Sequence, residues 1–180
     1  MKQIDWLFFD VGSTLVNEEK AYQERIKQAL ADTNISYAAF YQTMIHYFME
    51  NKKGDVEALK YYGLKLPTWN SDLEVLYPDC KNVLKTLHSH YKIGILANQL
   101  PNLLARLRNF GIDSYIDLII SSADVGLAKP NLAIFKLALQ QANCLAEHAV
   151  MIGDRLDNDI LPAKQLGMRT IWIRQGFSRL

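Results

Sequence analysis

The sequence contains few cysteines, no long apolar run and no excess of charge of one sign. Cys80 and Cys144 stand alone, without the paired spacing of a disulfide framework or a metal site, so a reducing cytoplasmic compartment is predicted. No stretch approaches the roughly 20 apolar residues that span a bilayer. Asp5 and Asp10 interrupt the N-terminal apolar run, and no signal-peptide cleavage pattern follows it. A membrane partner is therefore not expected.

The charge balance also limits the classes of partner. The chain has 20 basic and 19 acidic residues, a formal net charge of +1 at pH 7. Without a basic surplus, nothing favours binding to nucleic acid. Hydrophobic residues make up 49% of the 180 residues and charged residues 22%, as in ordinary globular proteins. This length suffices for one well-buried domain with a modest insertion.

Short apolar runs alternate with helical patterns along most of the chain. Strands are predicted at 4–9, 92–96, 117–121, 149–152 and 170–173. Strands that alternate with helices of about ten residues predict an α/β fold, here a Rossmann-like parallel sheet of about five strands with helices on both faces. Residues 17–76 break the series and predict a small all-helical cap inserted after the first strand. The core would then comprise residues 1–16 and 77–180.

Aromatic residues are frequent in the predicted cap. We expect most of them to form the cap's own small core, and the alternative is a wall that faces a substrate. Asp55 is predicted to cap the N-terminus of a short helix within this region.

Aspartates follow two of the predicted strands. Asp10 ends the first strand, Asp154 ends the fourth, and Asp159 comes about one helical turn later. Ligands of open parallel sheets bind at the carboxyl ends of the strands. A cluster of carboxylates there would suit a hard cation such as Mg²⁺. For Asp10 alone, an ordinary turn or helix-capping role is the alternative.

These residues belong to a set of motifs by which the chain resembles the haloacid dehalogenase (HAD) superfamily over nearly its whole length. The four motifs occur in the family's order: Asp10-Val11-Gly12-Ser13-Thr14, Ala97 followed by Asn98 and Gln99, Lys129-Pro130, and Gly153-Asp154 with Asp159. The resemblance implies an Mg²⁺-dependent phosphatase with a small helical cap. Its partner would be a small phosphorylated molecule, a phosphomonoester.

The resemblance also implies roles for individual residues. Asp10 would attack phosphorus and form an aspartyl-phosphate, and Lys129 would place a positive charge on the phosphoryl group. For Lys129 the alternative is a solvated lysine at a helix start. The implied metal ligands are Asp10, the main-chain carbonyl of Gly12, Asp154 and Asp159, the last in an outer-shell role through water or by holding Lys129. The implied phosphate-binding residues are Gly12, Thr14, Asn98 and Lys129, with Thr14 anchoring the turn.

Two positions depart from the family pattern. Gly12 stands where family phosphatases have the aspartate that protonates the leaving oxygen, and loss of such a group typically costs about 10²–10⁴-fold in rate. Ala97 lacks the hydroxyl of the second motif, for which backbone N–H groups or nearby side-chain amides would compensate. Glu18 and Glu19 are candidate replacements for the missing acid because they lie close by in the sequence.

Two alternative functions follow from these departures. One is a catalytically impaired regulatory protein that binds phosphate and metal. The other is cleavage of phosphonates through a Schiff base on a cap lysine, for which the chain offers Lys52, Lys53 and Lys60. The metal-independent dehalogenases are disfavoured because the acidic fourth motif is present.

Other polar residues near the fourth motif, and the histidines, are assigned simpler roles. We expect Arg155 at the surface, and Asp157 and Asn158 chiefly as helix-capping residues, with metal contact as the lesser possibility for Asp157. Solvated positions are expected for all the histidines: His46, His88, His90 and His148.

Overall fold

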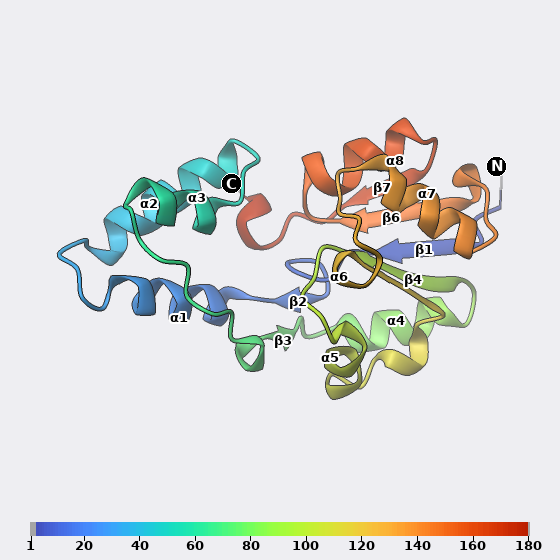
Figure 1. Cartoon of the computed structure of the whole chain (residues 1–180). Coiled ribbons are helices and arrows are strands. Elements are labelled where there is room, and N and C mark those ends of the chain that lie inside the picture. The colour runs from blue at the N-terminus through green and yellow to red at the C-terminus, as the bar shows by residue number, and fades with distance from the viewer. Residues whose placement is uncertain (1–2, 180) are drawn as a thin grey trace.

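The computed structural model describes residues 3–179 and contains a parallel five-stranded sheet in the order β5-β4-β1-β6-β7 (Figure 1). Every neighbouring pair is parallel. The strands are β1 (Trp6–Phe9), β4 (Lys92–Ala97), β5 (Leu118–Ser121), β6 (Ala149–Gly153) and β7 (Arg169–Trp172). The predicted Rossmann-like fold class is confirmed, because each predicted strand is present within a few residues of its expected position.

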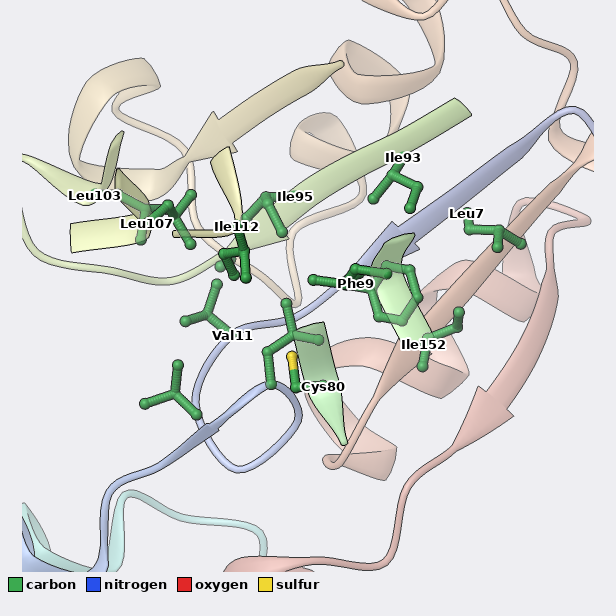
Figure 2. Packing of buried hydrophobic residues seen from close by; sticks show 14 of the residues in the cluster. Leu7, Phe9, Val11, Cys80, Ile93, Ile95, Leu103, Leu107, Ile112 and Ile152 are labelled. Carbon is green, nitrogen blue, oxygen red and sulfur yellow. The ribbon is translucent and has the colours of Figure 1, made fainter. Parts of the chain in front are cut away.

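Alternate residues of the strands pack against helices on opposite faces of the sheet. Leu7 and Phe9 join a core cluster with residues of α4 (Cys80–His88) and α5 (Leu103–Asn109), as Figure 2 shows. Phe8 points to the other face, where it packs with α7 (Leu132–Gln141) and α8 (Leu161–Gln165). This alternation is the period of a β-strand, and each buried large apolar side chain contributes about 1.5–3 kcal/mol. The sheet is thus a well-packed platform.

Short helical segments connect or follow the strands of the sheet. They are α6 (Ser122–Val125), η2 (Asp113–Tyr115), η3 (Ala146–His148), the π-helical turn η4 (Leu156–Ile160) and η5 (Gly176–Arg179). The helix predicted to begin at Asp157 starts with η4 and continues as α8. The helix α5 begins at Leu103, directly after Asn102, whose backbone is left-handed with φ +68°.

The segment between β1 and β4 contains a helical lobe, which we define as α1 (Glu19–Leu30), α2 (Tyr37–Met49) and α3 (Gly54–Tyr61). The lobe has its own buried core: Ile26, Phe40, Met44, Ala58 and Leu59. The lobe is followed by the short turn η1 (Ser71–Leu73), and the antiparallel strands β2 (Val16–Asn17) and β3 (Val75–Leu76) join the two ends of the segment. The division into a cap at 17–76 and a core at 1–16 and 77–180 stays a prediction, and residues 1, 2 and 180 lie outside the described range.

Asp55 is not the helix cap that the sequence predicted. It lies inside the first turn of α3, and the residue before this helix is Lys53. The carboxylate of Asp55 is buried and pairs with Arg25 of α1 at 2.5 Å. A cationic partner on another helix therefore takes the oxygens that would have capped α3.

The segment after β7 crosses from the sheet to the helical lobe (Figure 1). Phe177 stacks on Phe48 of α2, with ring centroids 4.3 Å apart, and meets Tyr22 of α1 edge-on at 5.0 Å. Aromatic pairs in such arrangements contribute about 0.5–1.5 kcal/mol beyond the burial of their area. Phe177 therefore fastens the lobe to the segment that follows β7.

Two further sequence predictions concern the cysteines and membrane-spanning helices. Both Cys80 and Cys144 are free thiols. Across residues 3–179, no helix has the length and apolar character needed to cross a bilayer.

Candidate active site

The carboxyl ends of β1 and β6 place three acidic side chains together. Phe9 of β1 lies opposite Ile152 of β6, so the residues that follow them emerge at the same edge of the sheet. Asp10, Asp154 and Asp159 are all buried, and each offers a carboxylate oxygen within 4.8 Å of the others. We call these three residues the acidic cluster.

Lys129 is buried against the acidic cluster. Its Nζ donates to Asp10 Oδ1 at 2.7 Å and to Asp159 Oδ1 at 2.5 Å. Burial alone would lower the pKa of Lys129, but the negative charges of Asp10 and Asp159 outweigh it and raise the pKa to about 12. Lys129 is therefore a permanent positive charge, and the alternative of a solvated lysine is wrong.

Asn98 fixes the backbone at Lys129. Its Nδ2 donates to the main-chain carbonyl of Lys129 at 2.8 Å, and its Oδ1 accepts from the main-chain N–H of Lys129 at 2.8 Å. Both ends of the amide are thus occupied by the lysine's own backbone. Asn98 lies at the cavity wall, where its clearest task is to position Lys129.

Asp159 is held by protein groups at both of its oxygens. Oδ1 accepts from Lys129, and Oδ2 accepts from the main-chain N–H of Arg155 at 3.0 Å. A Cβ at Gly153 would lie 2.5 Å from the Asp159 carboxyl carbon, so only glycine lets η4 approach the strand end this closely. This geometry fits Asp159 to an outer-shell position that holds Lys129.

The described residues do not fully balance the negative charge that Asp10 and Asp154 have when ionised. Within residues 3–177, no N–H or O–H group donates to the Asp154 carboxyl, and burial together with the charges of Asp10 and Asp159 raises its pKa to about 8. Burial also raises the pKa of Asp10 to about 6, although Lys129 opposes the change. A divalent cation with oxygen ligands would supply the missing charge, so the donor set fits Mg²⁺.

The other predicted residues are divided between the cavity and the protein interior. Gly12 lines the cavity in the turn after β1, and Ser13 lies beside it. Thr14 is buried, is not among the cavity-lining residues, and has no hydrogen-bond partner for its hydroxyl among the described residues. Its assignment to phosphate binding stays a prediction without a contact to support it. Ala97 is buried, and the two residues that follow it in the sequence, Asn98 and Gln99, line the cavity.

A cavity of about 760 Å³ lies between the acidic cluster and the helical lobe. Five aromatic side chains line it: Tyr22, Phe48, Trp69, Trp172 and Phe177. Five basic side chains also line it: Arg25, Lys53, Lys129, Arg155 and Arg174. The lobe's aromatic residues therefore serve both of the roles considered from the sequence, because Phe40 is fully buried in the lobe's core while Tyr22 and Phe48 reach the cavity.

The lysines proposed for a Schiff base are poorly placed for one. Lys52 pairs with Glu50 at 2.6 Å, and Lys60 pairs with Glu57 at 2.7 Å. Only Lys53 lines the cavity, and it is solvent-exposed. Because an amine nucleophile is normally activated by desolvation or by a neighbouring cation, phosphonate cleavage gains no support here.

Arg155 was expected at the surface, and this expectation is wrong. Its guanidinium is half-buried, pairs with Asp157 at 2.5 Å, and donates to the main-chain carbonyl of Asn51 in the lobe at 2.9 Å. The ion pair also explains why Asp157 lies outside the acidic cluster. Nothing in the local sequence indicates the contact with Asn51, which comes from a distant part of the chain. None of the four histidines is among the residues that line the cavity.

The two glutamates considered as replacements for the missing acid lie in different places. Glu18 lines the cavity, whereas Glu19 is exposed on the first turn of α1. Burial raises the pKa of Glu18 to about 8, and the negative charges of Glu74 and Asp10 add to the effect. Proximity in the sequence could not separate these two residues.

Comparisons with known proteins agree with this geometry. Residues 7–173 match the family model described as haloacid dehalogenase-like hydrolase. The chain is 27% identical over 194 residues to the pyrimidine 5'-nucleotidase YjjG of Escherichia coli, covering 94% of this chain and 85% of that protein. It is 28% identical over 193 residues to the glyceraldehyde 3-phosphate phosphatase of Pyrococcus abyssi, covering 94% and 81%. Among solved structures, the magnesium-bound HAD-hydrolase YfnB of Bacillus subtilis superimposes with a TM-score of 0.72 at 22% identity, covering 96% of this chain and 90% of that one.

Proposed function

Because this chain belongs to the haloacid dehalogenase-like hydrolase family, we propose that it is a magnesium-dependent phosphatase that acts on a small phosphomonoester through a phosphorylated Asp10. Similarity to curated phosphatases supports the class of reaction. The observation that carries the proposal is the acidic cluster, in which Asp10 and Asp154 lie buried at neighbouring strand ends with Lys129 beside them. A carboxylate nucleophile, oxygen ligands and a fixed positive charge are the groups that phosphoryl transfer requires.

The residues would act in sequence on the phosphate ester. One carboxylate oxygen of Asp10 attacks phosphorus, and the bond from phosphorus to the alcohol oxygen breaks. Lys129 carries a positive charge that offsets the charge on the phosphoryl oxygens, and Asn98 keeps its backbone in place. Water then attacks phosphorus and releases inorganic phosphate, which regenerates the Asp10 carboxylate.

Asp10, the Gly12 carbonyl and Asp154 would hold the metal, and Asp159 would act from the outer shell. When bound, Mg²⁺ supplies a Lewis acid that offsets charge on the phosphoryl oxygens. The protein itself contributes a fixed set of carboxylates around the metal position, since all three acidic side chains are buried.

The helical lobe is proposed as the cap over this site, and the cavity beneath it as the substrate pocket. A volume of about 760 Å³ suits a small metabolite. The relatives named above act on a pyrimidine 5'-nucleotide and on glyceraldehyde 3-phosphate, which differ greatly in size. Both belong in the panel that tests this chain.

Phosphate release from a panel of phosphomonoesters tests the proposal. We expect at least one small phosphomonoester to be hydrolysed in the presence of Mg²⁺ and no release above the buffer rate in EDTA. The panel should include glyceraldehyde 3-phosphate, pyrimidine 5'-nucleotides and para-nitrophenyl phosphate. If the folded protein binds Mg²⁺ in calorimetry but releases no phosphate from any member, the phosphatase proposal fails and the regulatory alternative is favoured.

Thermal unfolding with and without Mg²⁺ tests the metal site separately. In EDTA we expect stability to fall as the pH rises from about 5 to 8, because the raised pKa values of Asp10 and Asp154 mean that the folded state keeps protons the unfolded chain has lost. Mg²⁺ at about 100 times its Kd would add about 2.7 kcal/mol, or roughly 5–10 °C in Tm. The gain should be larger at pH 8 than at pH 6, because protons compete with the metal for these oxygens.

Asp154→Asn is the control for this measurement. It should abolish most of the Mg²⁺-induced rise in Tm and flatten the pH dependence in EDTA. A rise that is equal at both pH values, or that persists in the Asp154→Asn variant, would place the metal elsewhere.

A further inference from the structure

The side chain of Glu18 occupies the space that Gly12 leaves open. A Cβ atom at position 12 would lie 2.6 Å from both carboxylate oxygens of Glu18. Such distances are far below van der Waals contact, so the glycine and the glutamate fit one another. The carboxyl group therefore lies in the turn that immediately follows the proposed nucleophile, Asp10.

The local backbone explains how Glu18 reaches this position. The turn after β1 is closed by hydrogen bonds from the N–H groups of Leu15 and Val16 to the Val11 carbonyl, both at 2.9 Å. This turn brings β2, and with it Glu18, back over Gly12. Glu18 directly precedes α1 but makes no side-chain capping bond. Asn17 accepts from the N–H of Glu19 at 2.9 Å instead, which leaves the Glu18 carboxyl free to face the cavity.

The surroundings of Glu18 offer it no cationic partner. Arg106 is the nearby cation, but it pairs with the buried Glu74 and donates to Gln99 at 2.8 Å. Glu74 is further fixed by Trp69, whose indole N–H donates to it at 2.7 Å. Among residues 3–177, no N–H or O–H group donates to the Glu18 carboxyl. Its oxygens are thus available to a molecule in the cavity.

Hydrolysis of an alkyl phosphate needs a group of this kind. An alkoxide leaves slowly unless its oxygen is protonated as the bond to phosphorus breaks, and water attacks slowly unless it loses a proton. Asp10 cannot supply that proton, because it bonds to phosphorus in the same step. Gly12 has no side chain, and Glu18 is the carboxyl group that the fold places beside both.

We propose, on the basis of the phosphatase function above, that Glu18 is the general acid and base of this reaction. As Asp10 attacks phosphorus, the electron pair of the breaking phosphorus–oxygen bond goes to the alcohol oxygen, which takes the proton of Glu18 and leaves as the alcohol. The Glu18 carboxylate then removes a proton from water as the water oxygen attacks the phosphorus atom bound to Asp10. The bond to Asp10 breaks, inorganic phosphate is released, and Glu18 regains its proton.

Glu18→Gln tests this role because it keeps the shape of the side chain and removes proton transfer. With the best alkyl phosphate of the panel, we expect kcat to fall about 10²–10⁴-fold. Glu19→Gln, the same substitution at the adjacent exposed residue, should stay within twofold of the parent. If the parent protein is active and Glu18→Gln is as active as Glu19→Gln, the assignment of Glu18 is wrong while the phosphatase function stands. An inactive parent would instead overturn the proposed function.

A second substrate separates proton transfer from a merely structural role. The nitrophenolate of para-nitrophenyl phosphate leaves without being protonated, so the first step should survive in Glu18→Gln while the second step slows. We expect a burst of about one nitrophenolate per protein, with one phosphoryl group retained on Asp10 and detected by mass spectrometry. An equal loss of the burst and of steady-state turnover would contradict the acid and base role.

A double variant keeps the test independent of how well Glu18→Gln folds. Gly12→Asp combined with Glu18→Ala returns a carboxyl group to the same space from the other residue. We expect it to exceed Glu18→Ala in kcat by at least tenfold on the alkyl phosphate. A folded double variant no more active than Glu18→Ala would count against the assignment.

Discussion

Asp10→Asn is expected to lower kcat by about 10³-fold or more while the protein stays folded. The amide is a far weaker nucleophile than the carboxylate, and Asp10 is the acidic residue that directly follows β1. The fold should tolerate the change, because the burial that raises the pKa of Asp10 shows that its charge is costly in this position. The substitution loses the ionic bond from Lys129 but relieves part of this cost.

Acid-quenched single-turnover reactions measure this effect. The parent protein should carry one phosphoryl group that peptide mass spectrometry places on Asp10, and Asp10→Asn should carry none. Asp5→Asn is a matched control, since it makes the same substitution beside the opposite end of β1, where Asp5 pairs with His148 at 2.9 Å. A phosphoryl group on another residue, or activity above a tenth of the parent's in Asp10→Asn, would refute the role of Asp10 as nucleophile.

Lys129→Met is expected to lower the free energy of unfolding by about 3–5 kcal/mol, the largest stability effect that the site predicts. Removing the amine leaves Asp10 and Asp159 buried without their shared positive partner. Urea unfolding in EDTA at pH 7.5 measures the loss. Turnover should fall as well, because the phosphoryl group loses the charge that Lys129 provides.

Two variants make this result interpretable. Lys92→Met removes an exposed lysine that pairs with Asp117 at 2.8 Å, and such surface pairs contribute only about 0–1 kcal/mol. Lys129→Met with Asp159→Asn should recover part of the lost stability but none of the lost turnover, because one of the unpaired carboxylates is gone. If Lys129→Met alone changes stability by less than about 1 kcal/mol, the cluster is not organised around this lysine.

The sheet and the acidic cluster could be predicted from the sequence because their signals are local. Each strand is a short apolar run, and the carboxyl ends of parallel strands meet at one edge. Asp10 and Asp154 therefore lie close together, because β1 and β6 are neighbouring parallel strands. Lys129 also joined them as expected, although only the structure shows that Asn98 fixes its backbone.

The cavity wall could not be predicted, because its contacts join residues far apart in the chain. Arg25 lies on a polar position of α1, yet it pairs with Asp55 of α3. Its guanidinium carbon also lies 4.5 Å from the centroid of the Trp69 ring. Similarly, Gly12 indicated a missing acid, but only the folded turn shows that Glu18 rather than Glu19 fills its space. Helical periodicity describes which face of a helix is apolar, not which distant side chain it meets.

Arg155 contacts the acidic cluster and the helical lobe through different parts of the same residue. Its backbone N–H bonds to Asp159, while its guanidinium, at the end of a long side chain, reaches Asn51. Asp157 also accepts from this guanidinium, at 3.0 Å from Nε, so the side chain is held at both places. The arginine is a fixed link, which couples the position of the lobe to the backbone that orients Asp159.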